Sequence, residues 1–236
     1  MNREMFFITI HPKIVEAYRQ FGVFKSAEAR DVCQIHAVDL RDFAADKHGS
    51  IDDAPYGGGD GMVMRADCLG QALDWVKQEK IPGKKPMVIF TSPSGKPWTQ
   101  AQANKLAQGT VPLVFICGRF AGVDQRFIEQ CVDADFSVGD VVLAGGELPA
   151  LMIAESVLRV LPGVLGDVRS AIEDSFGAGM DGLLEYPSYT RPQEWRGNKV
   201  PEVLMSGNHE SISSWRRDQS LKKTVKMRPD LLKTKT

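Results

Sequence analysis

The stretch from Ser137 to Ala150, SVGDVVLAGGELPA, combines residue types that could bind a flat ligand. Gly139, Gly145 and Gly146 are compatible with backbone angles that a Cβ makes costly. They also leave backbone N–H and C=O groups accessible at close range, with apolar side chains between them. Taken alone, the segment is equally compatible with a simple glycine turn between a strand and a helix, with Pro149 at an early helical position.

Two further turns rich in small residues, 91–95 and 118–122, follow apolar runs that predict buried strands. Strands are expected at 5–10, 32–40, 87–91, 111–117 and 135–138, and helices at 14–24, 67–79, 98–107, 124–131 and 151–161. Asp67 is expected to cap the helix at 67–79, and the SGNH string at 206–209 is expected to be an N-cap region. This alternation predicts an α/β fold with a mainly parallel sheet. Because ligands bind beyond the carboxyl ends of parallel strands, we expect the three turns to converge on one site.

Charge is distributed unevenly along the 236 residues. From Arg216 onward there are eight Lys or Arg against two Asp, so this segment carries +6 and the remainder −7, for a net charge of −1. A basic C-terminal region on an acidic body indicates either a phosphate-binding surface or a solvated tail. The 43% apolar content is sufficient for a well-buried core.

Several classes of protein are disfavoured by the motifs. The four cysteines form no CxxC pair, which argues against a disulfide framework or a zinc site. The string PYGGGDGM (55–62) lacks the GK[ST] ending of a phosphate-binding loop, and no GxGxxG opens a helix. Neither a signal peptide nor an apolar run long enough to cross a membrane is present, so we expect a cytoplasmic protein with no membrane partner.

Nine strings in a fixed order resemble one family closely, the bacterial tRNA (guanine-N1)-methyltransferases of the SPOUT superfamily. The strings are DDAPYGGGDGM (52–62), SPSGK (92–96), ICGRFAGVDQR (116–126), SVGDVVLAGGELPA (137–150), PGVLGD (162–167), SAIEDSF (170–176), YTRP (189–192), VPEVLMSGNH (200–209) and WRRDQS (215–220).

The resemblance implies S-adenosylmethionine-dependent methylation of N1 of the guanosine just 3′ of the anticodon. It implies a deep trefoil knot, although true knots are nearly absent from folds. It also implies an obligate homodimer whose sites are completed by the second subunit, and the tRNA anticodon stem-loop as partner. We accordingly expect a knotted methyltransferase domain at 1–163, an interdomain linker at 164–194 and a basic helical tRNA-binding domain at 195–236.

The resemblance also assigns binding residues. The cofactor-binding positions are Ser92, Pro93, Gly118, Val138, Gly139, Asp140, Val141, Val142, Leu143, Gly145, Gly146 and Pro149. The substrate-binding positions are Pro55, Tyr56, Gly57, Gly58, Gly59, Ser170, Arg216 and Arg217.

Two residues match the catalytic positions of the family. Guanine N1 is protonated near neutral pH, so its methylation needs a base for that proton and a cation at O6. Asp174 resembles the general base, and Arg159 resembles the partner at O6, where a guanidinium keeps its charge. Without the resemblance, Asp174 would be interpreted as a helix N-cap and Arg159 as a surface ion pair with Glu155.

One string departs from the family pattern. The family usually has CGRYEG where this chain has CGRFAG, so Phe120 replaces a tyrosine and Ala121 a glutamate that is linked to activity and to Mg2+. An alanine side chain cannot coordinate a cation, so we predict no metal-binding residue and leave the need for Mg2+ open. Two alternatives follow: a tRNA-binding relative with impaired catalysis, and a SPOUT methyltransferase with another RNA target.

Overall fold

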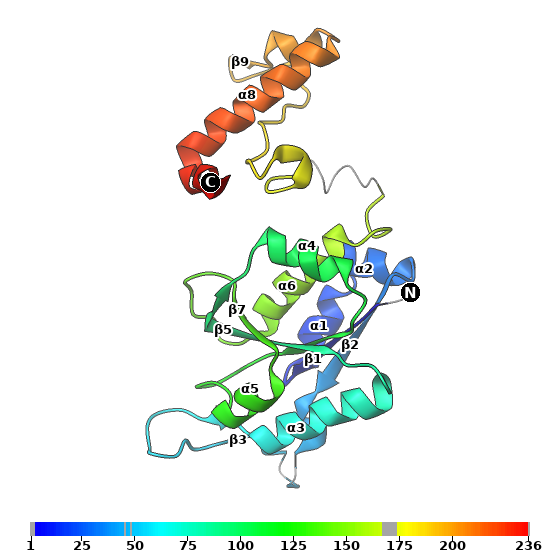
Figure 1. Cartoon of the computed structure of the whole chain (residues 1–236), viewed down its shortest axis with the longest axis vertical. Helices are drawn as coiled ribbons and strands as arrows, with labels where there is room; N and C mark the ends of the chain where they lie inside the picture. The colour runs from blue at the N-terminus through cyan, green and yellow to red at the C-terminus, as the bar shows by residue number, and fades with distance from the viewer. Residues whose placement is uncertain (1–2, 45, 48, 167–173, 236) are drawn as a thin grey trace. The chain divides into compact units, whose positions relative to one another are not determined.

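The computed structural model describes residues 3–44, 46–47, 49–166 and 174–235, and Ser170 therefore lies outside the described residues. The chain divides into two compact units, Met1–Gly166 and Asp167–Thr236 (Figure 1). The functions that we assigned to the two parts of the chain stay predictions.

A five-stranded parallel sheet forms the centre of the first unit, with strand order β2-β1-β6-β5-β7. The strands are β1 (Arg3–Thr9), β2 (Cys33–Asp39), β5 (Met87–Pro97), β6 (Leu113–Ile116) and β7 (Ala134–Ser137). Every pair in this sheet is parallel. The predicted α/β class with a mainly parallel sheet is confirmed.

Helices cover both faces of this sheet because successive strand residues point to opposite sides. Met5 and Phe7 of β1 pack into one apolar cluster, and Phe6 and Ile8 pack into the other. The first cluster includes α1 (Pro12–Tyr18), α2 (Gly22–Ala29), α4 (Gln100–Gln108) and α6 (Glu147–Val160), and the second includes α3 (Ala66–Trp75) and α5 (Gln125–Cys131) (Figure 1).

The helix expected at 14–24 is wrong in extent. The chain forms two helices, α1 and α2, because Phe21 has an extended backbone (φ −127°, ψ 162°) and Gly22, where α2 begins, takes a left-handed φ of +54°. The N-cap predicted at Asp67 is also wrong. The N-cap residue of α3 is Arg65. Asp67 lies in the first turn of α3, where its carboxylate accepts two hydrogen bonds from the Arg65 guanidinium.

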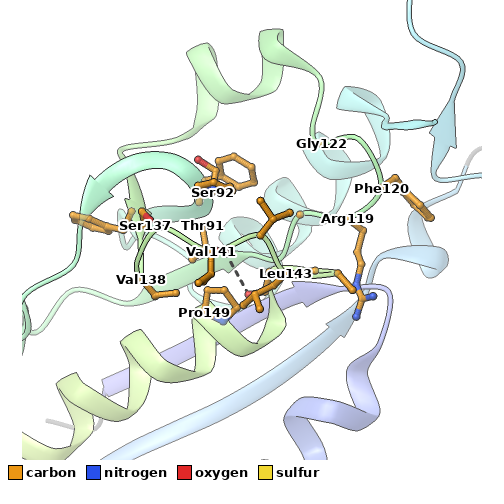
Figure 2. Close-up of a pocket in the computed structure, with 18 of the residues that line it drawn as sticks. Thr91, Ser92, Arg119, Phe120, Gly122, Ser137, Val138, Val141, Leu143 and Pro149 are labelled. Carbon is orange, nitrogen blue, oxygen red and sulfur yellow. Dashed lines mark hydrogen bonds between the residues drawn. The ribbon is translucent and has the colours of Figure 1, made fainter. Parts of the chain in front are cut away.

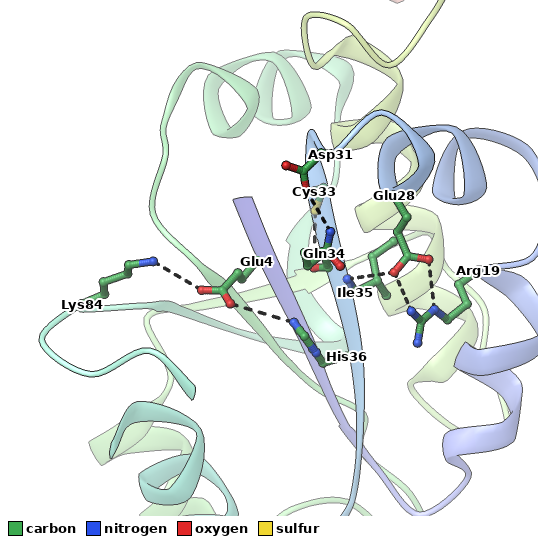
Figure 3. Close-up of polar contacts among 9 residues, drawn as sticks. All are labelled: Glu4, Arg19, Glu28, Asp31, Cys33, Gln34, Ile35, His36 and Lys84. Atoms are coloured by element: carbon green, nitrogen blue, oxygen red, sulfur yellow. Dashed lines mark hydrogen bonds and ion pairs between the residues drawn. The ribbon is translucent and has the colours of Figure 1, made fainter. Parts of the chain in front are cut away.

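The edge strand β2 is partly covered by polar side chains (Figure 3). The Glu28 carboxylate accepts a 3.4 Å hydrogen bond from the Ile35 N–H and is held by the Arg19 guanidinium at 2.6 Å. His36 stacks on Phe6 with ring centroids 4.5 Å apart, and its Nε2 lies 4.0 Å from Glu4 Oε1. A covered edge offers fewer free backbone groups for pairing with another chain.

Short elements complete the first unit. They are the 3-10 helix η1 (Leu40–Phe43), the antiparallel pair β3 (Asp52–Asp53) and β4 (Val63–Met64), and the π-helical turn η2 (Val76–Lys80) that continues α3. Cys33, Cys68 and Cys117 are buried, and burial raises the pKa of Cys33 to about 12. A thiol with so high a pKa stays protonated and unreactive near neutral pH.

The second unit is built around one long helix. Its elements are η3 (Ala178–Met180), β8 (Glu194–Trp195), β9 (Asn198–Lys199), η4 (Glu202–Met205), α8 (His209–Met227) and η5 (Pro229–Lys235). The Asn208 side chain caps α8 by accepting hydrogen bonds from the N–H groups of Glu210 and Ser211, as expected from the SGNH string. Among the described residues, no helix has the length and apolar character needed to cross a membrane.

Candidate active site

A cavity of about 260 Å3 lies beside residues 90–93 of β5 and at the carboxyl ends of β6 and β7. It is lined by residues of the three predicted turns, including Ser92, Arg119 and Leu143 (Figure 2). The predicted convergence of the three turns is therefore confirmed. Its cause is the parallel sheet, which places the carboxyl ends of neighbouring strands at the same edge.

The two adjacent glycines at the start of α6 are required by close packing. A Cβ on Gly146 would lie 2.8 Å from both the Gly118 nitrogen and Thr91 Oγ1, distances that Cβ atoms essentially never show. The Gly146 N–H donates a 2.8 Å hydrogen bond to the Gly118 carbonyl. A Cβ on Gly145 would lie 2.1 Å from Arg119 Nε. Of the three glycines in this segment, only Gly139 has a positive φ, +145°. Glycine is therefore required at position 139 by its backbone angle, and at positions 145 and 146 by the close approach of neighbouring atoms.

An ion pair with a buried carboxylate holds Arg119, one of the residues that line the cavity. Glu147 is 1% exposed and forms an ion pair with Arg119, in which Arg119 Nη2 lies 3.0 Å from Glu147 Oε2. The other carboxylate oxygen accepts a 2.7 Å hydrogen bond from the Thr9 hydroxyl at the end of β1. This network joins β1, the turn after β6 and the first turn of α6. Burial, with the neighbouring Glu147 charge, raises the pKa of the Cys117 thiol.

The turn at 92–95 is a bulge within one long strand. We expected the strand to end at Thr91, but β5 continues to Pro97, and Thr91 and Lys96 both pair with Phe136. The bulge places Ser92 on the cavity wall, where its hydroxyl donates a 2.7 Å hydrogen bond to Asp135. Burial raises the pKa of Asp135, and the hydrogen bond from Ser92 opposes that shift.

Eleven of the twelve predicted cofactor residues line this cavity, and Asp140 does not. Three consecutive apolar side chains of the wall are solvent-accessible, with Val141 at 56%, Val142 at 86% and Leu143 at 45%. Apolar side chains that are this exposed at a concave site are available to contact a ligand. The lining residues that the sequence interpretation missed are Phe90, Thr91, Arg119, Phe120, Ala121, Gly122, Phe136, Ser137 and Ala144.

The loop at 55–62 is tied to the cavity at its end. The Ala121 N–H donates a 2.8 Å hydrogen bond to the Met62 carbonyl, and a Cβ on Gly61 would lie 3.3 Å from the Ala121 Cβ. Tyr56, at the tip, is 99% exposed. The predicted substrate residues Pro55, Tyr56, Gly57, Gly58 and Gly59 all lie in this loop, and its three consecutive glycines have positive φ.

The side chain of Ala121 does not fit a magnesium site, because it has no oxygen. Among the described residues, no group of three or more His, Cys, Asp or Glu side chains is arranged so that it could hold a metal ion.

The other predicted catalytic and substrate residues lie on α6 and in the second unit. Arg159 is exposed in the last turn of α6. In the second unit, Asp174 is partly buried and its carbonyl accepts a 2.9 Å hydrogen bond from the Gly177 N–H. Arg216 and Arg217 are exposed on α8, where Arg216 lies over the Tyr186 ring and Arg217 pairs with Asp181 at 3.1 Å.

Comparison with known proteins identifies the family. Residues 3–234 match the sequence profile described as tRNA (Guanine-1)-methyltransferase TrmD. A tRNA (guanine-N(1)-)-methyltransferase of Sulfurihydrogenibium sp. (strain YO3AOP1) is 48% identical over 97% of this chain and 87% of its own length. Similarly named proteins of Frankia alni (strain DSM 45986 / CECT 9034 / ACN14a; 48%, covering 95% and 83%) and Bordetella parapertussis (strain 12822 / ATCC BAA-587 / NCTC 13253; 47%, covering 95% and 88%) are also similar. The chain belongs to the tRNA (guanine-1)-methyltransferase family.

Proposed function

We propose that this chain transfers a methyl group from S-adenosylmethionine to N1 of the guanosine just 3′ of the anticodon in tRNA. The observation that carries the proposal is the family match over residues 3–234, which spans both units. The relatives at 45–48% identity are named for guanine-N1 methylation of tRNA. The choice of the nucleotide 3′ of the anticodon rests on the nine strings described above.

The cavity after β5, β6 and β7 fits the cofactor. Its wall is backbone-rich at Gly118, Gly145 and Gly146, and a Cβ on either of the last two would collide with neighbouring atoms. Backbone groups of 92–93, 138–146 and Pro149 would hold S-adenosylmethionine, with Val141, Val142 and Leu143 covering its apolar parts. When bound, the cofactor supplies an electrophilic methyl group on its sulfonium.

Asp174 and Arg159 carry the acid–base chemistry in this proposal. The Asp174 carboxylate takes the proton from guanine N1, which makes the nitrogen nucleophilic. The Arg159 guanidinium stabilises the negative charge that then develops on O6. Because an arginine cannot lose its charge near neutral pH, it serves as an electrostatic partner and not as a second base.

The substrate surface combines the 55–59 loop with the basic helix. Tyr56 and the adjacent glycines contact the target nucleotide, and Arg216 and Arg217 contact backbone phosphates of the anticodon stem-loop. Support comes from the exposure of both arginines on α8 and from the +6 charge of residues 216–236. Phosphate contacts of this kind weaken as salt concentration rises.

A second copy of the chain completes the enzyme. Leu148 and Met152, one helical turn apart on α6, are 59% and 50% exposed. Tyr18 and Phe21 of the neighbouring α1 region are 39% and 70% exposed, and the Tyr18 hydroxyl donates a hydrogen bond to Glu155 of α6. These four residues form an apolar face, which we call the α1–α6 face, and which a second copy would cover.

Methyl transfer to two anticodon stem-loop transcripts tests the proposal. One transcript carries guanine 3′ of the anticodon and the other carries adenine, and both are supplied with labelled S-adenosylmethionine. We expect transfer to the guanine transcript alone. Binding of both transcripts without transfer would instead support a catalytically impaired relative, and Ala121→Glu would then be the variant to examine.

A further inference from the structure

The segment that follows Asp174 is a closed loop, which we call the 174–186 loop. The Phe176 N–H donates a 3.0 Å hydrogen bond to the Leu183 carbonyl. The Glu185 N–H donates a 3.0 Å hydrogen bond to Ser175 Oγ, the residue next to Asp174. Two hydrogen bonds therefore connect residues 175 and 176, immediately after Asp174, with residues 183 and 185.

This loop is pinned to α8 at a buried point. The Leu184 N–H donates a 3.0 Å hydrogen bond to Thr224 Oγ1, and Thr224 is fully buried. The Thr224 hydroxyl donates its own proton to the Ser220 carbonyl at 2.7 Å. Because a hydroxyl has one proton and two lone pairs, this arrangement leaves a lone pair of Oγ1 directed to Leu184. One buried side chain of the helix therefore anchors the loop.

Further contacts lie at the exposed rim of the same interface. Lys223 Nζ donates a 3.0 Å hydrogen bond to the Glu185 carbonyl. The Arg217–Asp181 ion pair at 3.1 Å joins α8 to the loop, and the Arg216 guanidinium lies 4.6 Å from the centre of the Tyr186 ring. Exposed pairs of this kind contribute little stability individually. The buried Thr224–Leu184 hydrogen bond is therefore the main constraint.

We propose that α8 positions Asp174, with Thr224 and Ser175 as positioning residues. The path runs from Thr224 to Leu184, through the adjacent Glu185 to Ser175, and from Ser175 to the neighbouring Asp174. The inference rests on the proposed function, in which Asp174 is the general base. A base is effective only when it is held at the proton that it removes, and a misplacement of about 1 Å can cost about 100-fold in rate. The tRNA-binding helix thus also orients the catalytic carboxylate.

Thr224→Val tests this inference because valine keeps the shape and removes the acceptor oxygen. We expect the single-turnover rate of methyl transfer to fall between about 10- and 100-fold, with tRNA affinity within about twofold of the wild type, since the phosphate contacts of α8 remain. Thr224→Ser keeps the hydroxyl and should restore the rate. Ser214→Ala, which removes an exposed hydroxyl from the same helix, is the matched control.

Ser175→Ala gives a second measurement outside α8. It removes the oxygen that accepts the hydrogen bond of the Glu185 N–H. As for Thr224→Val, we expect a lower rate of methyl transfer with nearly unchanged tRNA affinity. If Thr224→Val loses the circular dichroism signal of its helices and is therefore unfolded, Ser175→Ala alone tests the positioning role. A wild-type rate in either folded variant, or an equal loss of rate and tRNA affinity in both, would overturn the inference.

Asp174→Asn separates this inference from the proposed function. An inactive Asp174→Asn variant together with a wild-type rate in Thr224→Val would leave the base assignment in place and contradict only the positioning role. Full activity in Asp174→Asn would contradict the base assignment itself.

Discussion

At the residue scale, the shape of the cavity depends on two glycines, Gly145 and Gly146, that have no side chain. The positions of Gly145 and Gly146 permit no Cβ because backbone and buried side-chain atoms already occupy the space. The apolar residues between Gly139 and Gly145 are in contrast exposed to solvent. The glycines thus let the wall of the cavity come close to the strand ends, while the exposed side chains remain free to contact a ligand.

Gly146→Ala is expected to damage both packing and cofactor binding. The added Cβ would lie 2.8 Å from the Gly118 nitrogen, so backbone must shift, and overpacking of this kind costs about 1–3 kcal/mol. We expect S-adenosylmethionine to bind at least about tenfold more weakly, the equivalent of about 1.4 kcal/mol, as measured by isothermal titration calorimetry. Gly70→Ala is the matched control, because a Cβ there meets nothing within 4 Å and alanine favours the helix. Equal cofactor affinity in the two variants would contradict the role of Gly146.

Glu147→Leu is expected to destabilise the first unit by about 3–5 kcal/mol, because it leaves the Arg119 charge without its buried partner. Chemical denaturation measures the change. The double variant Arg119→Leu/Glu147→Leu should lose less than the sum of the two single variants, since residues in one network are coupled. Additive losses would show that the ion pair is not an energetic unit.

At the element scale, strands were more predictable than the ends of helices. All five strands were recognisable in the sequence, most clearly the inner strands β1, β5 and β6, which are buried on both faces. The break between α1 and α2 was missed, since an isolated glycine in a helical pattern is compatible with either outcome. The continuation of β5 through its bulge was also missed, because Ser92, Pro93 and Gly95 are typical of turns.

The candidate site was predictable only where it is made of local sequence. The three turns could be found because glycine and serine gather after apolar runs. The Thr9–Glu147 hydrogen bond joins residues 138 positions apart, and no periodicity of either element indicates it. The strings ICGRF and GGE contain Arg119 and Glu147, but their pairing required the fold. The knot and the roles of Asp174 and Arg159 stay predictions.

The β1–β2 edge is expected to respond to pH through His36. Burial lowers the pKa of His36 below its usual 6.5; Arg19 and Lys80 add to this shift, and Glu4 and Glu28 oppose it. The unfolded chain therefore binds a proton more readily, so stability present above about pH 6.5 is lost as the pH falls through the lower folded pKa. Thermal unfolding between pH 7.5 and 5 should show a smaller decrease for His36→Gln than for the wild type. Parallel curves for the two proteins would contradict this role of His36.

At the scale of the whole molecule, the chain consists of an α/β unit with a ligand-sized cavity and a basic helical unit that carries Asp174. In the proposed mechanism the two units supply different chemistry: the first presents backbone and apolar surface to the cofactor, whereas α8 of the second presents cations and would hold Asp174 in position. The net charge of −1 arises because the +6 of residues 216–236 is balanced by −7 over the rest of the chain.

The α1–α6 face predicts the oligomeric state. We expect the wild type to sediment as a dimer at micromolar concentration and Met152→Glu to sediment as a monomer, because a carboxylate would be buried without a partner in the interface. The monomer should also lose methyl transfer. Met205→Glu, which changes a similarly exposed methionine of the second unit, is the control. A monomeric wild type, or a dimer that persists in Met152→Glu, would contradict the proposed interface.

The most direct test of the account is the chemical identity and position of the product. A full-length tRNA transcript with guanine 3′ of the anticodon would be treated with the enzyme and labelled S-adenosylmethionine, digested, and resolved by mass spectrometry. We predict 1-methylguanosine at that position alone, and none with Asp174→Asn. Label on another base, at another position, or retained in full by Asp174→Asn would contradict it.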